Sequence, residues 1–490
     1  DPSSYLAEGK VAAQGADGCW TIVDGVKDEA GLKAAFEKGG NIVLGADIRV
    51  AETVILAEGK TAVLDLNGKT ITGPNVAKDA EGNKIHVIIN NGTLTLKNGT
   101  VTSAADNAGS AVLNYGTIVV EDVTLNGAPM VDGGWPSYAI NNYGNLTVNS
   151  ATINTYHGAI ATGGDGVSVI NDATVDVGQN TQTKQTSWAL YVFENGQLTV
   201  NNGTFKNTKD EQNKVYGGGY ICATSTKETV INGGTFDKTE GDNNGKGIYY
   251  NCTNLIIKGG TFDTDPTTHC AEGYAAVQNV NGTWSVIPTV LKDGAVLDLG
   301  GAEYNGTITV EGNVTIKGNT KIKTLKSTTG CTITIEDGKT LALNNFSFGA
   351  KDNANAEYEI KGGTVTANYG FFQHGTYVLR SNFETGYMYY SFGSDITVYG
   401  TFHSQGKGDG LDYVRGKLTI AKGGKSIHDK SLWVGQPASW GAMNASLVIE
   451  DGGYVQANSL SVYEGSSLTY SNDADLKYNS VTGTEYITKK

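Results

Sequence analysis

The sequence predicts an all-β fold in which the chain winds as a parallel β-solenoid. Three observations predict it: a glycine-rich but proline-poor composition (67 Gly and 7 Pro in 490 residues), a motif that recurs along the chain, and strands rich in Thr, Val and Asn rather than helix formers. Glycine without proline and without a three-residue period excludes collagen. The hydrophobic content of 39% is enough to form a core.

The recurring motif is a Gly, a run of alternating β-formers, then Asn or Gly, Thr and one more apolar residue. It reads GTLTLKNGTVTS from Gly92 and GQLTVNNGTFKN from Gly196. A further short apolar run precedes each copy, so that one repeat holds about three strands, which bury their apolar faces only by stacking on neighbouring repeats. The matching apolar positions, separated by 24, 28, 22, 30, 31 and 26 residues, are Val101, Leu125, Ile153, Val175, Phe205, Phe236 and Phe262.

Two other architectures compete with the solenoid of strands. A helical solenoid is disfavoured because the repeats lack apolar residues at helical spacing. An array of β-sandwiches stays open, since turn signals every 8 to 12 residues also fit that class. The repeat of about 25 residues favours the solenoid, because a sandwich needs about 100 residues.

Three asparagines stand two residues before a turn glycine in successive repeats: Asn90, Asn114 and Asn142. In stacked coils these side chains would lie above one another at roughly 4.8 Å. The sequence therefore predicts a ladder in which amide bonds to amide.

A longer duplication divides the chain. Residues 1–20 match residues 265–284 without a gap, and nine positions are identical at an offset of 264. We interpret the segment as a small hairpin-like module that starts or joins solenoid units. The predicted domains are the module (1–24), a solenoid with an N-terminal capping helix (25–264), a second copy of the module (265–288) and a second, less regular solenoid (289–490).

One helix is predicted, from Glu29 to Lys38. Leu32, Ala35 and Phe36 share a face, and the glycine pair that begins at Gly39 ends the helix. Such a helix would cover the open end of the first solenoid and shield a strand edge that would otherwise invite aggregation.

Charge and motifs exclude several functions. The net charge of −14 and the presence of three arginines disfavour nucleic-acid binding, and no apolar run reaches the length of a membrane span. We predict no catalytic residues, no metal ligands and no cofactor, because the chain lacks an Asp-Asp dipeptide, a GxSxG elbow, a Walker loop and HExxH. The most site-like polar cluster is Tyr156-His157-Gly158 near Asp165, for which an ordinary structural role is the better interpretation.

Aromatic residues are the better indication of a binding site. They fall in loops or short strands of adjoining repeats, where rings in register would form a platform for sugar faces or a protein contact. Packing on neighbouring coils is the alternative explanation. Trp135, between Gly134 and Pro136, stands out. The predicted binding residues are Trp135, Tyr138, Tyr143, Tyr115, Trp188 and Tyr191.

The repeats resemble those of right-handed parallel β-helix proteins of the pectin-lyase-like superfamily, and most of all adhesin-like surface proteins of gut bacteria. The resemblance covers most of residues 41–262 and, less regularly, 290–480. The segment from residue 1 resembles the short DPxxYxAEGYxA…DGTWxV units of multi-unit surface proteins, so we expect one piece of a longer array.

The resemblance implies a non-catalytic stalk or adhesin on the bacterial cell surface, outside the cell. The expected partners are a host or bacterial surface glycan or protein and, end to end, other copies of the chain, with no nucleic acid and no membrane insertion. Two alternatives stay open: a polysaccharide lyase or glycoside hydrolase of the β-helix fold, and a phage tail or head fibre.

Overall fold

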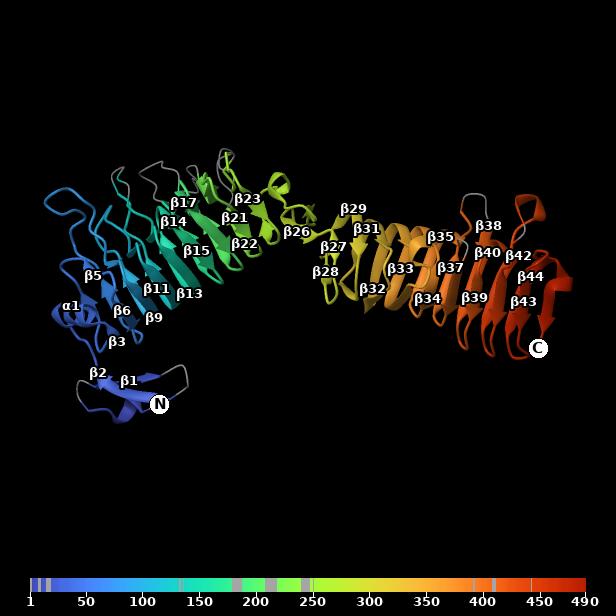
Figure 1. The fold of residues 1–490 in the computed structure, drawn as a ribbon, viewed down its shortest axis with the longest axis horizontal. Coiled ribbons are helices and arrows are strands. Elements are labelled where there is room, and N and C mark those ends of the chain that lie inside the picture. The colour runs from blue at the N-terminus through green and yellow to red at the C-terminus, as the bar shows by residue number, and fades with distance from the viewer. Residues whose placement is uncertain are drawn as a thin grey trace. The chain divides into compact units, whose positions relative to one another are not determined.

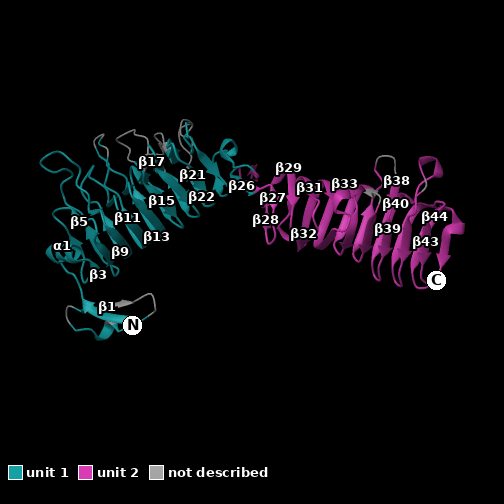
Figure 2. Cartoon of the chain, viewed as in Figure 1, with its two compact units in different colours: residues 1–272, 283–287 teal, residues 273–282, 288–490 magenta. Residues whose placement is uncertain are grey.

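The structure, a computed structural model, describes the chain except residues 1, 8–9, 15–18, 132–133, 135, 179–186, 208–217, 239–246, 250, 391–392, 408–410 and 442. Two compact units divide it (Figures 1 and 2). Unit 1 comprises residues 1–272 and 283–287, and unit 2 comprises residues 273–282 and 288–490. Within the described residues, no helix is long and apolar enough to cross a membrane.

The N-terminal segment forms a short 3-10 turn, η1 (Ser3–Tyr5), and an antiparallel pair, β1 (Lys10–Gln14) with β2 (Trp20–Asp24). Helix α1 (Glu29–Lys38) follows and confirms the predicted bounds. The Asp28 side chain caps its start by accepting from the Gly31 N–H.

Leu32 and Phe36 of α1 are buried, and the helix packs against strand β5 (Val54–Leu56) (Figure 1). Gly39 ends the helix with φ at 78°, in the left-handed region that glycine tolerates best.

Three stacks of parallel strands make up most of the rest of unit 1 (Figure 1). Each turn of the chain adds one strand or half-strand to two of the stacks, and every turn except the last two also adds a strand to the third. Strands β9 (Thr93–Thr102), β11 (Thr117–Asn126) and β13 (Asn145–Thr155) serve stack 1A with their first halves and stack 1B with their second halves. The other strands of stack 1A are β3 (Gly40–Val43), β6 (Thr61–Asp65), β15 (Val167–Ile170), β18 (Gln197–Val200), β21 (Thr229–Ile231) and β23 (Leu255–Ile257).

Stacks 1B and 1C run beside stack 1A along the same coils. The other strands of stack 1B are β4 (Ile48–Arg49), β7 (Thr70–Thr72), β16 (Thr174–Val177), β19 (Thr204–Asn207), β22 (Thr235–Lys238) and β24 (Thr261–Phe262). Stack 1C consists of β5, β8 (Ile88–Asn90), β10 (Val112–Asn114), β12 (Ile140–Asn142), β14 (Gly158–Thr162), β17 (Ser187–Val192) and β20 (Gly218–Ala223).

Unit 1 also holds η2 (Thr267–His269) and all but the last residue of β26 (Trp284–Pro288), whereas β25 (Tyr274–Gln278) belongs to unit 2. Strand β26 pairs with β24 in antiparallel fashion.

Unit 2 has the same plan. Stack 2A contains β28 (Val296–Asp298), β30 (Val314–Lys317), the starts of β32 (Cys331–Phe348) and β33 (Glu357–Phe372), and then β34 (Gly375–Leu379), β36 (Ser394–Val398), β39 (Lys417–Ile420), β41 (Ser446–Ile449), β43 (Ser467–Tyr470) and β45 (Ile487–Lys489).

The remaining strands of unit 2 pass through stacks 2B and 2C. Stack 2C begins with β27 (Val290–Leu291) and includes β38 (Leu411–Val414), and it takes the ends of long strands that first pass through stack 2B. The strands of stack 2B besides the middles of β32 and β33 are β29 (Glu303–Val310), β31 (Thr320–Ser327), β35 (Asn382–Tyr390), β37 (Thr401–Ser404), β40 (Lys425–Val434), β42 (Tyr454–Val462) and β44 (Asp475–Thr482).

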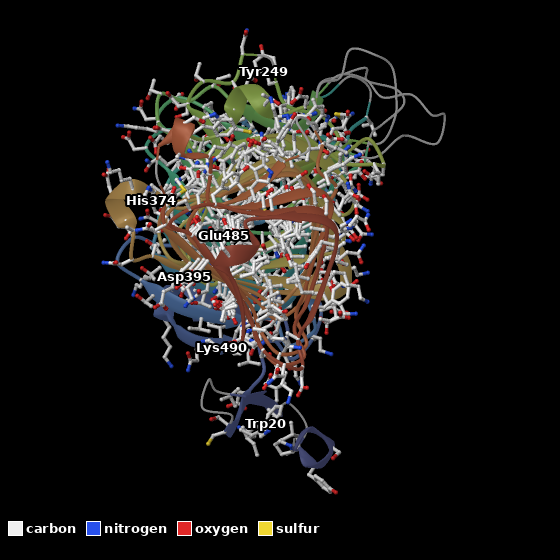
Figure 3. The ribbon with its side chains drawn as sticks, turned by 90° about the vertical axis from the view of Figure 1, so that its right-hand side faces the viewer. Trp20, Tyr249, His374, Asp395, Glu485 and Lys490 are labelled. Atoms are coloured by element: carbon white, nitrogen blue, oxygen red, sulfur yellow. The ribbon has the colours of Figure 1, made fainter. Side chains whose placement is uncertain are left out.

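Three 3-10 turns, η3 (Lys351–Asn353), η4 (Ala438–Trp440) and η5 (Thr484–Tyr486), connect these strands. Figure 3 faces the end of unit 2 that carries Glu485 and Lys490, and shows side chains packed between the strands.

The register follows the repeat found in the sequence. Each of the seven apolar positions from Val101 to Phe262 pairs with the next one along the chain. All seven side chains are buried. The residue before each, a Thr in every coil, lies on the outer side of stack 1B, where a β-branched side chain suits the pleated surface.

The asparagine ladder is confirmed inside stack 1C. The Asn90 amide donates to Asn114 Oδ1 and the Asn114 amide to Asn142 Oδ1, both at 2.7 Å, and the exposed fraction of all three side chains is 0%. The parallel pairing of the stacks is compatible with a β-helix or solenoid, and it excludes antiparallel sandwiches for the described strands of stacks 1A to 2C.

Candidate binding surface

Five of the six predicted binding residues lie on or beside stack 1C. Tyr115 and Tyr143 directly follow β10 and β12, Tyr138 shortly precedes β12, and Trp188 and Tyr191 belong to β17. Trp135 lies outside the described residues.

The alternation of the strands places these rings outside. In β10, Val112 and Asn114 point inward and are fully buried, so Leu113 and the Tyr115 that follows it face outward. Tyr191 pairs with Ala161 of the preceding coil and takes the same outward position. Tyr115 is 54% exposed and Tyr143 is 37% exposed.

Four of the five described residues form one row together with Phe193, which the sequence analysis did not single out. Tyr115 stacks on Tyr143 at 5.4 Å between ring centroids. Phe193 meets Tyr143 edge-on at 6.3 Å and stacks on Tyr191 at 4.9 Å. Tyr191 in turn stacks on Tyr138 at 5.9 Å. We call Tyr115, Tyr138, Tyr143, Tyr191 and Phe193 the unit 1 aromatic row.

Glycines in the intervening coil make room for this row. A Cβ at Gly163 would lie 2.1 Å from Phe193 Cζ, and a Cβ at Gly158 would lie 2.1 Å from Tyr138 Cε1. Each ring therefore packs directly on the backbone of a glycine. Because Gly163 has no side chain, Phe193 can reach across its coil and contact Tyr143.

The row consists of neutral phenol and phenyl rings. Burial raises the pKa of the phenols of Tyr138, Tyr143 and Tyr191, so these hydroxyls stay neutral at physiological pH. Neutral rings offer apolar faces with a hydroxyl donor at the edge, which suits stacking against sugar C–H groups or aromatic side chains.

The other two sequence signals lie apart from the row or beneath it. Trp188 pairs with Tyr249, at 5.5 Å and 73° between the rings. His157 is buried against the edge of Tyr138, and burial lowers the pKa of its imidazole to about 4. Asp165 accepts from the Asn195 amide at 3.2 Å on the exposed surface, whereas His157 is buried.

Unit 2 carries a second group of aromatic residues, which sequence reasoning missed. Trp433 lies 5.6 Å from Tyr413, 5.8 Å from Trp440 and 5.1 Å from Tyr463 between ring centroids. The Arg415 guanidinium lies 4.8 Å above the ring of Tyr413. We call Tyr413, Trp433, Trp440 and Tyr463 the unit 2 aromatic cluster.

Trp440 is the most exposed member of this cluster, with 55% of its surface accessible. The Gln436 amide braces the loop that carries it, by donating to the carbonyls of Trp440 and Gly441 at 3.0 and 2.8 Å. The segment WVGQPASW, with a Trp at each end of a Gly- and Pro-containing loop, was the available signal in the sequence.

A Ser–His–Asp arrangement occurs inside unit 2. Ser426 Oγ lies 2.9 Å from His428 Nε2, and His428 Nδ1 lies 2.7 Å from Asp412. Ser404 donates to the other carboxylate oxygen of Asp412 at 2.8 Å. These side chains are at most 1% exposed, so a substrate cannot reach them and the network has a structural role.

No group of three or more His, Cys, Asp and Glu side chains that could hold a metal ion occurs in the part of the chain that the structure describes. Comparison with family models, curated protein sequences and solved structures gives no match.

Proposed function

We propose that this chain is a non-catalytic surface protein of a gut bacterium, acting outside the cell as a rigid stalk with adhesive faces. The two units would be right-handed, pectin-lyase-like β-helices, and α1 would cap the first. Their parallel stacks and internal hydrogen-bonded ladders support rigidity, because each coil is paired along its length to the next.

The unit 1 aromatic row is the observation that carries the adhesive role. It leaves Tyr115 and Tyr143 partly open to solvent on a surface built from consecutive coils. Rings held on a stacked backbone lose little conformational freedom on binding, and they can stack on the C–H faces of successive sugar residues. A surface glycan is therefore the proposed ligand, and a protein with exposed aromatic side chains is the other candidate.

The test is binding of the whole chain to an array of host and bacterial glycans. The Tyr143→Ala variant should lose at least tenfold in apparent affinity for any glycan bound by the parent, because it removes the ring that joins Tyr115 to Phe193. Tyr399→Ala is the matched control, because this tyrosine is 45% exposed but belongs to unit 2 and lies under Arg380.

Two outcomes would contradict the proposal. Equal loss in the Tyr399→Ala variant would show that the row has no special role. Release of reducing ends from the bound glycan would show that the chain is an enzyme instead.

A further inference from the structure

The unit 2 aromatic cluster belongs to a longer column of aromatic residues in stack 2C. Phe371 of β33 pairs with Tyr389 of β35, and Tyr389 pairs with Tyr413 of β38. Tyr413 in turn pairs with Trp433 of β40 (Figure 1). One register position of the stack therefore carries an aromatic residue in four successive coils, which lie about 4.8 Å apart.

Further rings flank this column on the solvent side. Phe372 is 0% exposed and faces the interior, so its neighbour Phe371 takes the outer side of β33. Tyr369, two residues before Phe371, is 46% exposed and stacks on it at 6.3 Å between ring centroids. Tyr387 meets Tyr369 edge-on at 6.4 Å. We call Tyr369, Phe371, Tyr387 and the unit 2 aromatic cluster together the unit 2 aromatic strip.

The strip is poor in charge. Its two columns give eight register positions on β33, β35, β38 and β40, and these hold six aromatic residues, Leu411 and Ser431. Among the described residues, Arg415 is the charged side chain that lies over a ring of the strip, with its guanidinium 4.8 Å from the centre of Tyr413. That cation already has a partner in the face of the ring. The strip therefore suits an uncharged occupant.

The rings of the unit 2 aromatic cluster do not share a plane. Trp433 meets Tyr413 at 79° and Tyr463 at 61°. In the unit 1 aromatic row, by contrast, the three stacked pairs are inclined by 17°, 25° and 15°. Nearly parallel rings match the flat face of a sugar, whereas steeply inclined rings match a ligand whose surface has ridges.

A polyproline II helix is a ligand of this kind. It has three residues per turn and rises about 3.1 Å per residue, so prolines three positions apart lie about 9.3 Å apart on one side of the helix. Two coils of a parallel stack advance by about 9.6 Å, so rings in alternate coils match the repeat of a P-x-x-P segment. The helix has no internal hydrogen bonds, and its carbonyls can accept from the indole N–H of a tryptophan.

The most exposed ring of the cluster is held in place before any ligand arrives. Trp440 is 55% exposed, and the Gln436 amide donates to the carbonyls of Trp440 and Gly441. A ring on a braced loop and a ligand that is already extended both lose little conformational freedom on binding. Aromatic-lined surfaces recognise proline-rich segments for this reason.

We propose that the unit 2 aromatic strip binds a proline-rich segment of another protein, in the polyproline II conformation and lying across the coils of stack 2C. From Phe371 to Tyr463 the strip covers five coils, which is about 19 Å or about six residues of such a helix. None of the seven prolines of this chain stands three residues from another, so a second copy does not supply the segment. The inference does not rest on the proposed adhesion to glycans.

Fluorescence anisotropy of a fluorescein-labelled decaproline peptide, titrated with the full chain, tests this proposal. The parent should bind it saturably, and the Trp440→Ala variant should bind it about tenfold more weakly or worse. Tyr399→Ala is the matched control and should bind like the parent, because this tyrosine is 45% exposed in the same unit but lies outside the strip. Tyr143→Ala should also bind like the parent, so the role of the unit 1 aromatic row can fail or stand independently.

Peptide length and peptide stiffness give the second readout. Affinity should rise with length up to about six prolines and then level off, because a longer helix extends beyond the strip. A flexible, uncharged decamer of alternating Gly and Ser should bind about tenfold more weakly than decaproline.

Four outcomes would overturn the proposal. They are the absence of saturable binding by the parent, an equal loss in the Tyr399→Ala variant, displacement of the peptide by the uncharged glucan cellohexaose, and dimers of the parent that Trp440→Ala abolishes. The third outcome would assign the strip to a glycan, and the fourth would assign it to a second copy of the chain.

Discussion

Both units bury polar side chains between their stacked strands, and the two units differ in how these side chains are hydrogen-bonded. Unit 1 repeats one side chain: Asn90, Asn114 and Asn142 bond amide to amide, and Ser168 accepts the last amide at 3.0 Å. Unit 2 instead joins different side chains, with Asp412 between Ser404 and His428. In the ladder, each asparagine side chain hydrogen-bonds to an identical side chain in the next coil. In the mixed network, each side chain needs a different and specific hydrogen-bond partner.

This difference predicts how much stability each unit loses when one of its buried polar side chains is replaced. A ladder can lose a rung and keep part of its hydrogen bonding, because backbone groups also bond to the amides. A network with a carboxylate at its centre leaves two buried groups without an acceptor when the carboxylate is removed. The substitutions below test this contrast.

Replacing Asp412 by Ala should have the largest effect. It removes the acceptor of both His428 and Ser404 in an interior where Asp412 is 0% exposed. The free energy of unfolding should fall by about 4 kcal/mol, because two buried side chains lose an acceptor, at about 1 to 3 kcal/mol for each group. Chemical denaturation measures it, followed by the fluorescence of Trp433 and Trp440 in a full chain whose other four tryptophans are replaced by Phe.

The matched control is Asp395→Ala in the same unit. Its carboxylate lies 3.8 Å from the Lys417 ammonium, with about half of each side chain exposed. A change below about 1 kcal/mol is expected for such a surface pair. Equal effects of the two substitutions would show that the buried network does not hold unit 2 together.

Acid should weaken unit 1 through His86. Its Nδ1 accepts from the Ser110 N–H at 2.8 Å, and burial, with Lys84 nearby, lowers the pKa of the imidazole from 6.5 to about 4. Between these values the unfolded chain binds a proton that the folded chain excludes, so stability is full above pH 6.5 and falls as the pH drops toward 4. The loss should reach about 3 kcal/mol.

The His86→Asn variant tests this prediction by calorimetry of the full chain at pH 7 and pH 4. Asn keeps an acceptor near Ser110 but does not titrate, so the transition of unit 1 should shift less with pH than in the parent. His157 is buried with its pKa lowered to about 4 and leaves a residual dependence of the same sign. An unchanged pH dependence would contradict the assignment to His86.

Removing one rung of the ladder should cost less. Asn114→Leu deletes the hydrogen bonds to Asn90 and Asn142, but the Asn90 amide still reaches the Thr117 carbonyl at 2.9 Å. We expect a loss of about 2 kcal/mol in unfolding free energy. Asn171→Leu is the control, since it interrupts a similar ladder on the exposed surface, and it should cost about 0.5 kcal/mol or less.

The features that repeat along the chain, or that have local signals, could be predicted from the sequence. The ladder could be predicted from Asn90, Asn114 and Asn142 because their spacing to a turn glycine is constant, and the helix from Glu29 because its start and stop signals are local. The parallel register likewise follows from apolar positions that recur.

Contacts between residues that follow no repeat could not be predicted from the sequence. The network of Ser404, Asp412 and His428 joins positions whose proximity depends on the lengths of the connecting loops, and no motif spacing reports these lengths. Phe193 joins the aromatic row only because Gly163 leaves space beneath its ring. Tyr115 and Tyr143, in contrast, directly follow ladder asparagines and therefore share their constant spacing to the turn glycine.

The smallest effect on stability should come from the surface that is proposed to bind. Tyr115 is 54% exposed and stacks on Tyr143 alone among the rings of the row, so Tyr115→Ala should lower the unfolding free energy by less than about 1 kcal/mol. A double-mutant cycle with Tyr143→Ala isolates the ring pair and should give a coupling of about 0.5 kcal/mol. A loss above about 2 kcal/mol would mean that Tyr115 supports the coils in the way Asn114 does, and an aromatic row that the fold needs for its stability would be poor evidence of a ligand.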